Sequence, residues 1–112
     1  MEPLVKRSGK KALDRIFSAK EQAYCDSLKM RLEHYAVRFA AKEAVLKALK
    51  IKPTRGRVLS GIEIQREATG KPFIAFSEQM RTLLRVPVKA QIELSLAHER
   101  EYAIATVVIV VP

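Results

Sequence analysis

What decides the fold of this chain is the stretch Arg38-Phe39-Ala40-Ala41-Lys42-Glu43-Ala44-Val45-Leu46-Lys47-Ala48-Leu49. It is rich in strong helix formers and lacks Gly and Pro, so it predicts a helix. We expect this helix to begin near residues 29–31 and to end by Lys50, before Pro53. Glu43 falls in the middle of a predicted apolar stripe, which is formed by Leu32, Ala36, Phe39, Leu46 and Lys50. An unpaired carboxylate is costly to bury, so we expect Glu43 to be protonated, paired or bound to a metal.

A simpler interpretation of Glu43 is a helix-supporting ion pair. Lys47 follows it by one helical turn, and such an i, i+4 pair stabilises a helix by roughly 0.2–0.5 kcal/mol. Helical periodicity alone favours this interpretation, so the rest of the chain has to decide between the two.

The first half of the chain predicts two further helices. Residues 1–17 form a basic amphipathic pattern that Ser8-Gly9 weakens in the middle. Ser18 and Glu21 have the spacing of a capping box, so a second helix should begin there.

The second half predicts antiparallel strands. Residues 58–66 alternate apolar and polar side chains, a turn at 68–70 follows, and residues 71–76 return. Ser77 caps a short helix that extends to Leu84. Residues 91–97 alternate again, residues 98–101 turn, and residues 102–111 form a continuous apolar strand. The fold class is therefore α+β, with helices from the first half packed on an antiparallel sheet from the second.

Length and composition limit the possible functions. We expect 112 residues to form a single domain, 1–112. Cys25 has no partner for a disulfide, and we see neither a secretory leader nor a run long enough to cross a membrane, so we expect a cytoplasmic protein. The net charge of +9 is concentrated in residues 1–57, with fifteen Lys/Arg against six Asp/Glu, whereas residues 58–112 carry six of each. A basic half attracts nucleic acids, anionic membranes, phosphorylated ligands or acidic proteins.

Three separated phrases resemble, in the right order, the holo-acyl-carrier-protein synthases, the small trimeric class of 4'-phosphopantetheinyl transferases. They are the central stretch with Glu43 and Lys47, Gly70-Lys71-Pro72 in a predicted hairpin turn, and Ser95-Leu96-Ala97-His98-Glu99 before an apolar strand. The resemblance extends over nearly the whole chain. It implies transfer of the phosphopantetheine arm of coenzyme A to a serine of apo-acyl carrier protein, for fatty-acid biosynthesis. Magnesium is bound and adenosine 3',5'-bisphosphate is released.

The same resemblance assigns roles to individual residues. Glu43 resembles the glutamate that ligates Mg²⁺, an ion commonly held by one or two carboxylates together with phosphate oxygens and water. Lys47 resembles the lysine that contacts the phosphates, and both residues are predicted to be catalytic. The coenzyme A pocket would also include Gly70, Lys71, Ser95 and His98. Taken alone, Lys71 is more simply interpreted as a solvated turn residue and His98 as a surface residue of a hairpin.

Two parts of the family pattern are absent from this sequence. Family members begin with a strand that carries Gly-x-Asp, whose aspartate is a second magnesium ligand, whereas this sequence opens at its first helix. The family's Gly-Thr-Gly after the central helix is replaced by Lys50-Ile51-Lys52. The alternative to an active enzyme is therefore a truncated form or an impaired paralogue that binds coenzyme A or acyl carrier protein without turnover. An RNA-binding module is a third hypothesis, but interleaved exposed aromatics and nucleic-acid motifs are missing.

Two partners follow from these patterns. The apolar strand at 102–111 needs cover on both faces, by a helix and by a neighbouring subunit. The family builds its sites between subunits, so we expect a homotrimer in which the central helix of one protomer meets the Lys71 or the Ser95 and His98 region of another. The basic residues Lys6, Arg7, Lys10 and Lys11 are predicted to dock the acidic acyl carrier protein, and a solvated helix face is the alternative. We expect neither nucleic acid nor membrane as a partner.

Overall fold

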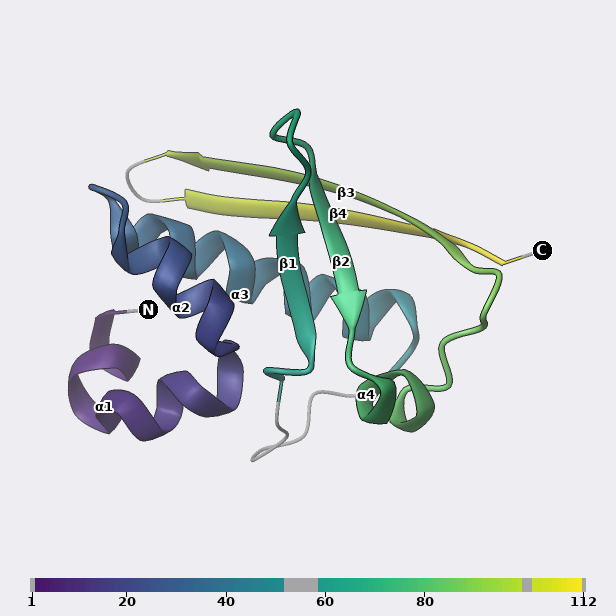
Figure 1. Ribbon diagram of the computed structural model, residues 1–112, viewed down its shortest axis with the longest axis horizontal. Coiled ribbons are helices and arrows are strands. Elements are labelled where there is room, and N and C mark those ends of the chain that lie inside the picture. Colours follow the sequence, from purple (N-terminus) through teal and green to yellow (C-terminus); the bar gives the residue numbers. More distant parts are fainter. Residues whose placement is uncertain (1, 52–58, 100–101, 112) are drawn as a thin grey trace.

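The computed structural model describes residues 2–51, 59–99 and 102–111, with the side chains of 2–8 and of residue 99 outside the description. It has helices in the first half and two antiparallel hairpins in the second, as predicted (Figure 1). The elements are α1 (Glu2–Ile16), α2 (Ala19–Asp26), α3 (Arg31–Ala48), β1 (Ile62–Arg66), β2 (Pro72–Phe76), α4 (Glu78–Leu83), β3 (Gln91–Glu99) and β4 (Tyr102–Val110).

The boundaries of the first two helices follow from single residues. Gly9 interrupts α1 with a non-helical backbone (φ 59°, ψ −149°), so α1 consists of two segments joined at a kink. Ser18 then caps α2. Its side chain accepts from the Glu21 amide, and the Glu21 carboxylate accepts from the Ser18 amide, which is the predicted capping box.

Helix α3 is the element on which the others pack. Three clusters of buried apolar side chains follow one another along it. Tyr35 packs with Phe17 and Cys25 from the α1–α2 side, and Ala41 packs with side chains from both hairpins. Near its C-terminal end, Val45 and Leu46 pack with β1 and with the segment around α4. This arrangement explains why the stretch that starts at Arg38 decides the fold.

The two hairpins lie against α3 in different ways (Figure 1). In the β1–β2 hairpin, Ile64 pairs with Ile74, and the buried residues Ile62 and Ile64 lie on one face as predicted. The longer β3–β4 hairpin pairs Leu94 with Val107 and runs along α3. Its inner face, with Leu94, packs on that helix. The fold class predicted from the sequence is therefore confirmed.

The outer face of the β3–β4 hairpin is open in this single chain. Four large apolar side chains of β4 are more than half exposed on it, namely Tyr102, Ile104, Val108 and Val110. The prediction that a helix covers one face of this strand is confirmed, and the other face is free to meet a partner.

The turn between β3 and β4 is shorter than the sequence predicts. The turn predicted at 98–101 was too long, because His98 and Glu99 continue β3 and pair with Ala103 and Tyr102. The side chain of His98 contacts Glu33 of α3. This contact supports a strand that continues beyond the segment with alternating side chains. Residues 52–57, whose basic and Pro- and Gly-containing sequence predicts a loop, lie outside the described residues. None of the described helices combines the length and hydrophobicity that a membrane span requires.

Candidate active site

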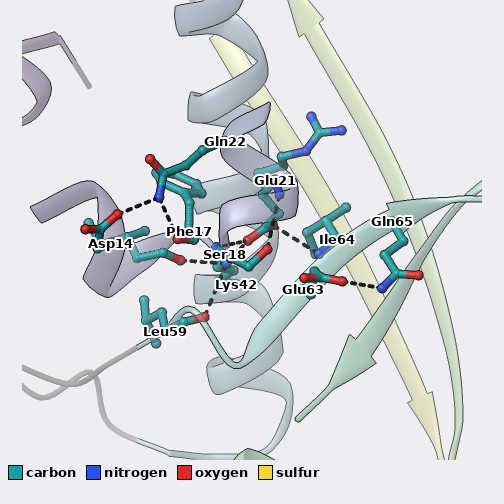
Figure 2. A network of polar contacts seen from close by, with 12 residues as sticks. Asp14, Phe17, Ser18, Glu21, Gln22, Lys42, Leu59, Glu63, Ile64 and Gln65 are labelled. Atoms are coloured by element: carbon teal, nitrogen blue, oxygen red, sulfur yellow. Dashed lines mark hydrogen bonds and ion pairs between the residues drawn. The ribbon is translucent and has the colours of Figure 1, made fainter. Parts of the chain in front are cut away.

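The buried charge at the centre of the molecule is Lys42, not Glu43. The side chains of Lys42 and Glu21 are both fully buried, and Lys42 Nζ lies 2.6 Å from Glu21 Oε1 (Figure 2). Lys42 Nζ also donates to the carbonyl oxygens of Ile16 at 2.6 Å and Leu59 at 3.2 Å. Glu21 Oε2 accepts from the amide of Ile64 at 3.0 Å. This ion pair therefore links α2, α3, the end of α1, the segment before β1, and β1 itself.

The environment of this pair affects the pKa values of Lys42 and of the residues near it. Burial lowers the pKa of Lys42, and the adjacent Glu21 carboxylate opposes that effect. Nearby, Glu63 accepts a hydrogen bond from Gln65 (Figure 2). Burial works to raise the pKa of Glu63, but hydrogen bonds from Ser18 and Gln65 and nearby lysines lower it overall. Burial also raises the pKa of Cys25 to about 11, so this thiol is a core residue and not a nucleophile.

The prediction that Glu43 sits in a buried stripe was wrong by one residue. Glu43 is half-buried, whereas Arg38, Ala41, Lys42 and Val45 are fully buried. Adjacent helix positions differ by about 100°, so the buried face is rotated by roughly that angle from the predicted one. Hydrophobicity could not locate this face, because two of its central members, Arg38 and Lys42, are cations.

Glu43 and Lys47 are an acidic and a basic residue of α3 that do not bond to each other. Lys47 is exposed and lies one helical turn after Glu43. Within the described ranges, neither side chain forms a hydrogen bond or an ion pair. The simple helix-supporting ion pair is therefore not formed, and neither group is engaged by a residue that the structure describes.

His98 lies at the other end of α3 and belongs to a small polar cluster. Its Nδ1 is 3.0 Å from Glu33 Oε2, and its ring packs edge-on against His34 with 4.9 Å between centroids. Burial, followed by the neighbouring His98 and the cations Arg38 and Arg66, lowers the pKa of His34. Burial and these neighbouring groups therefore disfavour the charged form of His34.

A surface cavity of about 240 Å³ opens beside this cluster, between α2, α3 and β1. Arg38 lines it with only 1% of its surface exposed, together with Lys20, Tyr24 and Arg66 and with the acidic residues Glu21 and Glu63. The Arg38 guanidinium stacks on Tyr24 at 4.8 Å and donates to the His34 carbonyl at 3.3 Å, while its Nε has no partner among the described residues. Three cations line the cavity against two acids, and one of these acids, Glu21, is already paired with Lys42. The lining therefore has an excess of positive charge, which suits an anion.

The structure places the remaining predicted pocket residues on the hairpins. Gly70 has φ 92°, so the β1–β2 turn requires glycine at this position. Lys71 follows it and forms an exposed pair with Glu93 of β3, with 3.3 Å between Nζ and Oε2. Ser95 and His98 lie on opposite faces of β3, because side chains alternate along a strand and His98 faces α3. One chain therefore does not bring Ser95 and His98 together.

The predicted docking residues lie on α1. Lys10 Nζ donates to Gln22 at 2.7 Å and lies 3.3 Å from Asp14, so its charge is already partly compensated. Lys11 is exposed. The side chains of Lys6 and Arg7 lie outside the described residues, although both belong to α1.

Sequence reasoning missed Glu33, His34 and Arg38. The sequence did contain a signal for Arg38: it precedes Lys42 by one helical turn, so the two cations lie on the same face of α3. The contact between Glu33 and His98 joins residues 65 positions apart and had no local signal.

Comparisons with known proteins agree with this geometry. Residues 1–107 match the model of the 4'-phosphopantetheinyl transferase superfamily. The chain is 39% identical over 101 residues to a protein named holo-[acyl-carrier-protein] synthase from Protochlamydia amoebophila, covering 90% of this chain and 80% of that protein. A protein of the same name from Cytophaga hutchinsonii is 42% identical over 94 residues, covering 82% and 74%.

Solved structures agree as well. Holo-[acyl-carrier-protein] synthase of Helicobacter pylori in complex with coenzyme A is similar with a TM-score of 0.77 and 29% identity, covering 97% of this chain and 90% of that one. The enzyme from Neisseria meningitidis gives a TM-score of 0.82 and 27% identity, covering 96% and 86%. The central helix and the two hairpins agree with these matches in sequence and in structure. This chain therefore belongs to the 4'-phosphopantetheinyl transferase superfamily.

Proposed function

We propose that this chain is a holo-acyl-carrier-protein synthase, which transfers the 4'-phosphopantetheine arm of coenzyme A to a serine of apo-acyl carrier protein. The serine oxygen forms a bond to the phosphorus next to pantetheine, and the bond from that phosphorus to the bridging oxygen breaks. The serine proton is released, and adenosine 3',5'-bisphosphate leaves. The observation that carries the proposal is the Glu43–Lys47 couple on α3, which no described residue engages, in a member of this family.

Lys47 and Glu43 have distinct tasks in this proposal. The exposed ammonium of Lys47 binds the diphosphate and neutralises the negative charge that develops on the leaving group. Glu43 offers a carboxylate without a competing cation among the described residues, which fits a ligand of Mg²⁺. No group of three or more metal-ligating side chains occurs in the described part of the chain, so diphosphate oxygens and water would complete the coordination. A bound Mg²⁺ would draw electron density from the phosphorus under attack.

The coenzyme A contacts in this proposal extend beyond α3. Gly70, Lys71, Ser95 and His98 belong to them, and we add the cavity lined by Lys20, Arg38 and Arg66 as a site for one of the anionic groups of the ligand. Glu33, which contacts His98, precedes Glu43 by ten residues, a separation of about 15 Å along the helix at 1.5 Å per residue. One chain therefore holds the two parts of the site apart.

A second copy of the chain resolves this separation. We include a homotrimer in the proposal, with the α3 couple of one protomer facing the Lys71 or His98 region of another. The exposed apolar face of β4 supports it, because such faces are typical of interfaces. We place the reaction in the cytoplasm, and the free Cys25 thiol fits that reducing compartment.

A direct assay tests the function. The purified chain is incubated with coenzyme A, MgCl₂ and apo-acyl carrier protein, and the carrier protein is weighed by mass spectrometry. We expect one phosphopantetheine per carrier protein. In the Glu43→Gln variant, kcat/KM should fall at least about a hundredfold, the typical loss when a group that stabilises the transition state is removed. Since Glu43 is only half-buried, thermal unfolding should hardly change.

Controls separate the alternatives. Glu78→Gln removes an exposed acid from α4, which carries none of the predicted site residues, and should leave turnover unchanged. Calorimetry should detect Mg²⁺ binding only when coenzyme A is present, because a single carboxylate holds Mg²⁺ poorly. Coenzyme A binding without any mass increase would instead support the impaired, binding-only protein. Failure to bind coenzyme A at all would contradict both.

A further inference from the structure

The contact between Glu33 and His98 is built into the fold. Glu33 lies in the first turn of α3 and His98 near the end of β3, so the pair joins a helix to a strand 65 residues away. The side chains are only 19% and 30% exposed, with 3.0 Å between Oε2 and Nδ1. The His34 ring packs against the imidazole from another side in a T-shaped arrangement, with 4.9 Å between centroids.

This geometry determines which ring nitrogen is available. A carboxylate is an acceptor, so the Nδ1 of His98 carries the hydrogen and donates a hydrogen bond to Glu33 Oε2. The other nitrogen, Nε2, has no partner among the described residues and is the one that can meet a ligand. A histidine oriented through one nitrogen by a carboxylate, with the other at the ligand, is a recurrent arrangement in functional sites.

We infer that Glu33 is a positioning residue for substrate binding, which fixes the ring of His98 so that Nε2 is presented to coenzyme A. The inference rests on the proposed function, in which His98 contacts coenzyme A. Glu33 acts only through His98 and contacts neither the ligand nor the reacting atoms. It therefore affects binding of coenzyme A more than the chemical step.

A set of variants tests this inference by coenzyme A affinity, measured by calorimetry. Glu33→Ala should weaken binding about five- to tenfold, the effect of one lost hydrogen bond. Glu33→Gln keeps an acceptor oxygen and should restore most of the affinity. His98→Ala should weaken binding at least as much as Glu33→Ala, and the double variant should be no weaker than His98→Ala alone. KM for coenzyme A should rise with kcat nearly unchanged.

A spectroscopic measurement tests the contact without any ligand. The ¹⁵N resonances of the His98 ring should place the proton on Nδ1 in the unaltered chain, and Glu33→Ala should remove this preference. Glu78→Ala is the matched control, because Glu78 is also the acidic residue of a first helical turn but lies in α4, away from His98. It should change neither the resonances nor the affinity.

The outcomes distinguish this inference from the proposed function. Unchanged His98 resonances in Glu33→Ala, or additive losses in the double variant, would overturn the role of Glu33 while leaving the transferase proposal intact. Unchanged coenzyme A affinity in His98→Ala would overturn the assignment of His98, and the role of Glu33 with it.

Discussion

At the scale of single residues, the Lys42–Glu21 pair is the most consequential contact in the molecule. Both charges are removed from water, which is costly unless every polar atom finds a partner. Here Lys42 Nζ has three oxygen partners, and both oxygens of Glu21 accept hydrogen bonds. The pair therefore behaves as a unit. Removing one of the two charges should lower the free energy of unfolding far more than removing both.

Replacing Lys42 with Met tests this unit. The variant leaves the Glu21 carboxylate buried without its cation, so we expect it to lower the free energy of unfolding by about 3–5 kcal/mol. The double variant Glu21→Gln with Lys42→Met carries no buried charge and should be more stable than Lys42→Met alone. Urea unfolding measures both. A loss below 1 kcal/mol for Lys42→Met would show that water reaches the pair.

At the scale of elements, the C-terminus of α3 carries a local strain. The Ile51 amide donates to the Leu46 carbonyl at 2.8 Å and the Lys50 amide to the Lys47 carbonyl at 3.0 Å, which is the Schellman pattern. Lys50 occupies the left-handed position of this motif, with φ 60°. Glycine is preferred there because a Cβ atom makes this conformation unfavourable.

The Lys50→Gly variant should therefore stabilise the protein. We expect a gain of about 1 kcal/mol, the typical cost of a left-handed conformation for a residue with a Cβ atom. Thermal unfolding measures it, and Lys89→Gly serves as control, since Lys89 is exposed and is not among the described residues with positive φ. A loss of stability in Lys50→Gly would mean that the lysine side chain contributes more than its backbone strain costs.

Helix α1 is the element predicted to dock the acyl carrier protein. Reversing two of its charges, Arg7→Glu with Lys11→Glu, should weaken carrier-protein association at least tenfold, about 1.4 kcal/mol. Opposite surface charges mainly speed encounter, so the affinity of the unaltered chain should also fall steeply with salt. Surface plasmon resonance at several salt concentrations measures both effects.

A matched reversal tests whether position or total charge matters. Lys29→Glu with Lys89→Glu changes the net charge equally at two exposed sites outside α1. This control should retain carrier-protein binding, and both double variants should bind coenzyme A normally. Equal losses in the two double variants would show that α1 is an ordinary solvated face.

The sequence was informative wherever a local rule applied. Ser18 and Glu21 predicted the start of α2, and the alternation at Ile62 and Ile64 predicted β1, because capping and strand periodicity involve neighbours in the chain. The second role of Glu21, as partner of Lys42, depends on a residue 21 positions away and was invisible. Resemblance selected Glu43 and Lys47, whereas helical periodicity alone placed Glu43 at the centre of the buried face, when it lies about one residue away from that centre.

At the scale of the whole molecule, the open face of β4 predicts self-association. The Ile104→Lys variant places a charge in the middle of this face, where Ile104 is 60% exposed. We expect light scattering to show trimers for the unaltered chain and monomers for this variant, with unchanged circular dichroism. Val88→Lys is the control, because Val88 is an 88% exposed apolar residue outside β4. Monomers of the unaltered chain at micromolar concentration would contradict the prediction.

The long reach of the central ion pair also affects synthesis of the protein on the ribosome. Glu21 and Lys42 are made early, but two of their partners, the Leu59 carbonyl and the Ile64 amide, are made much later. Until β1 emerges, Lys42 and Glu21 each lack one of these partners, so burying the pair is more costly and we expect the three helices to pack less stably. Folding during translation should therefore wait for the first hairpin, and nascent chains released before that point should remain sensitive to proteases.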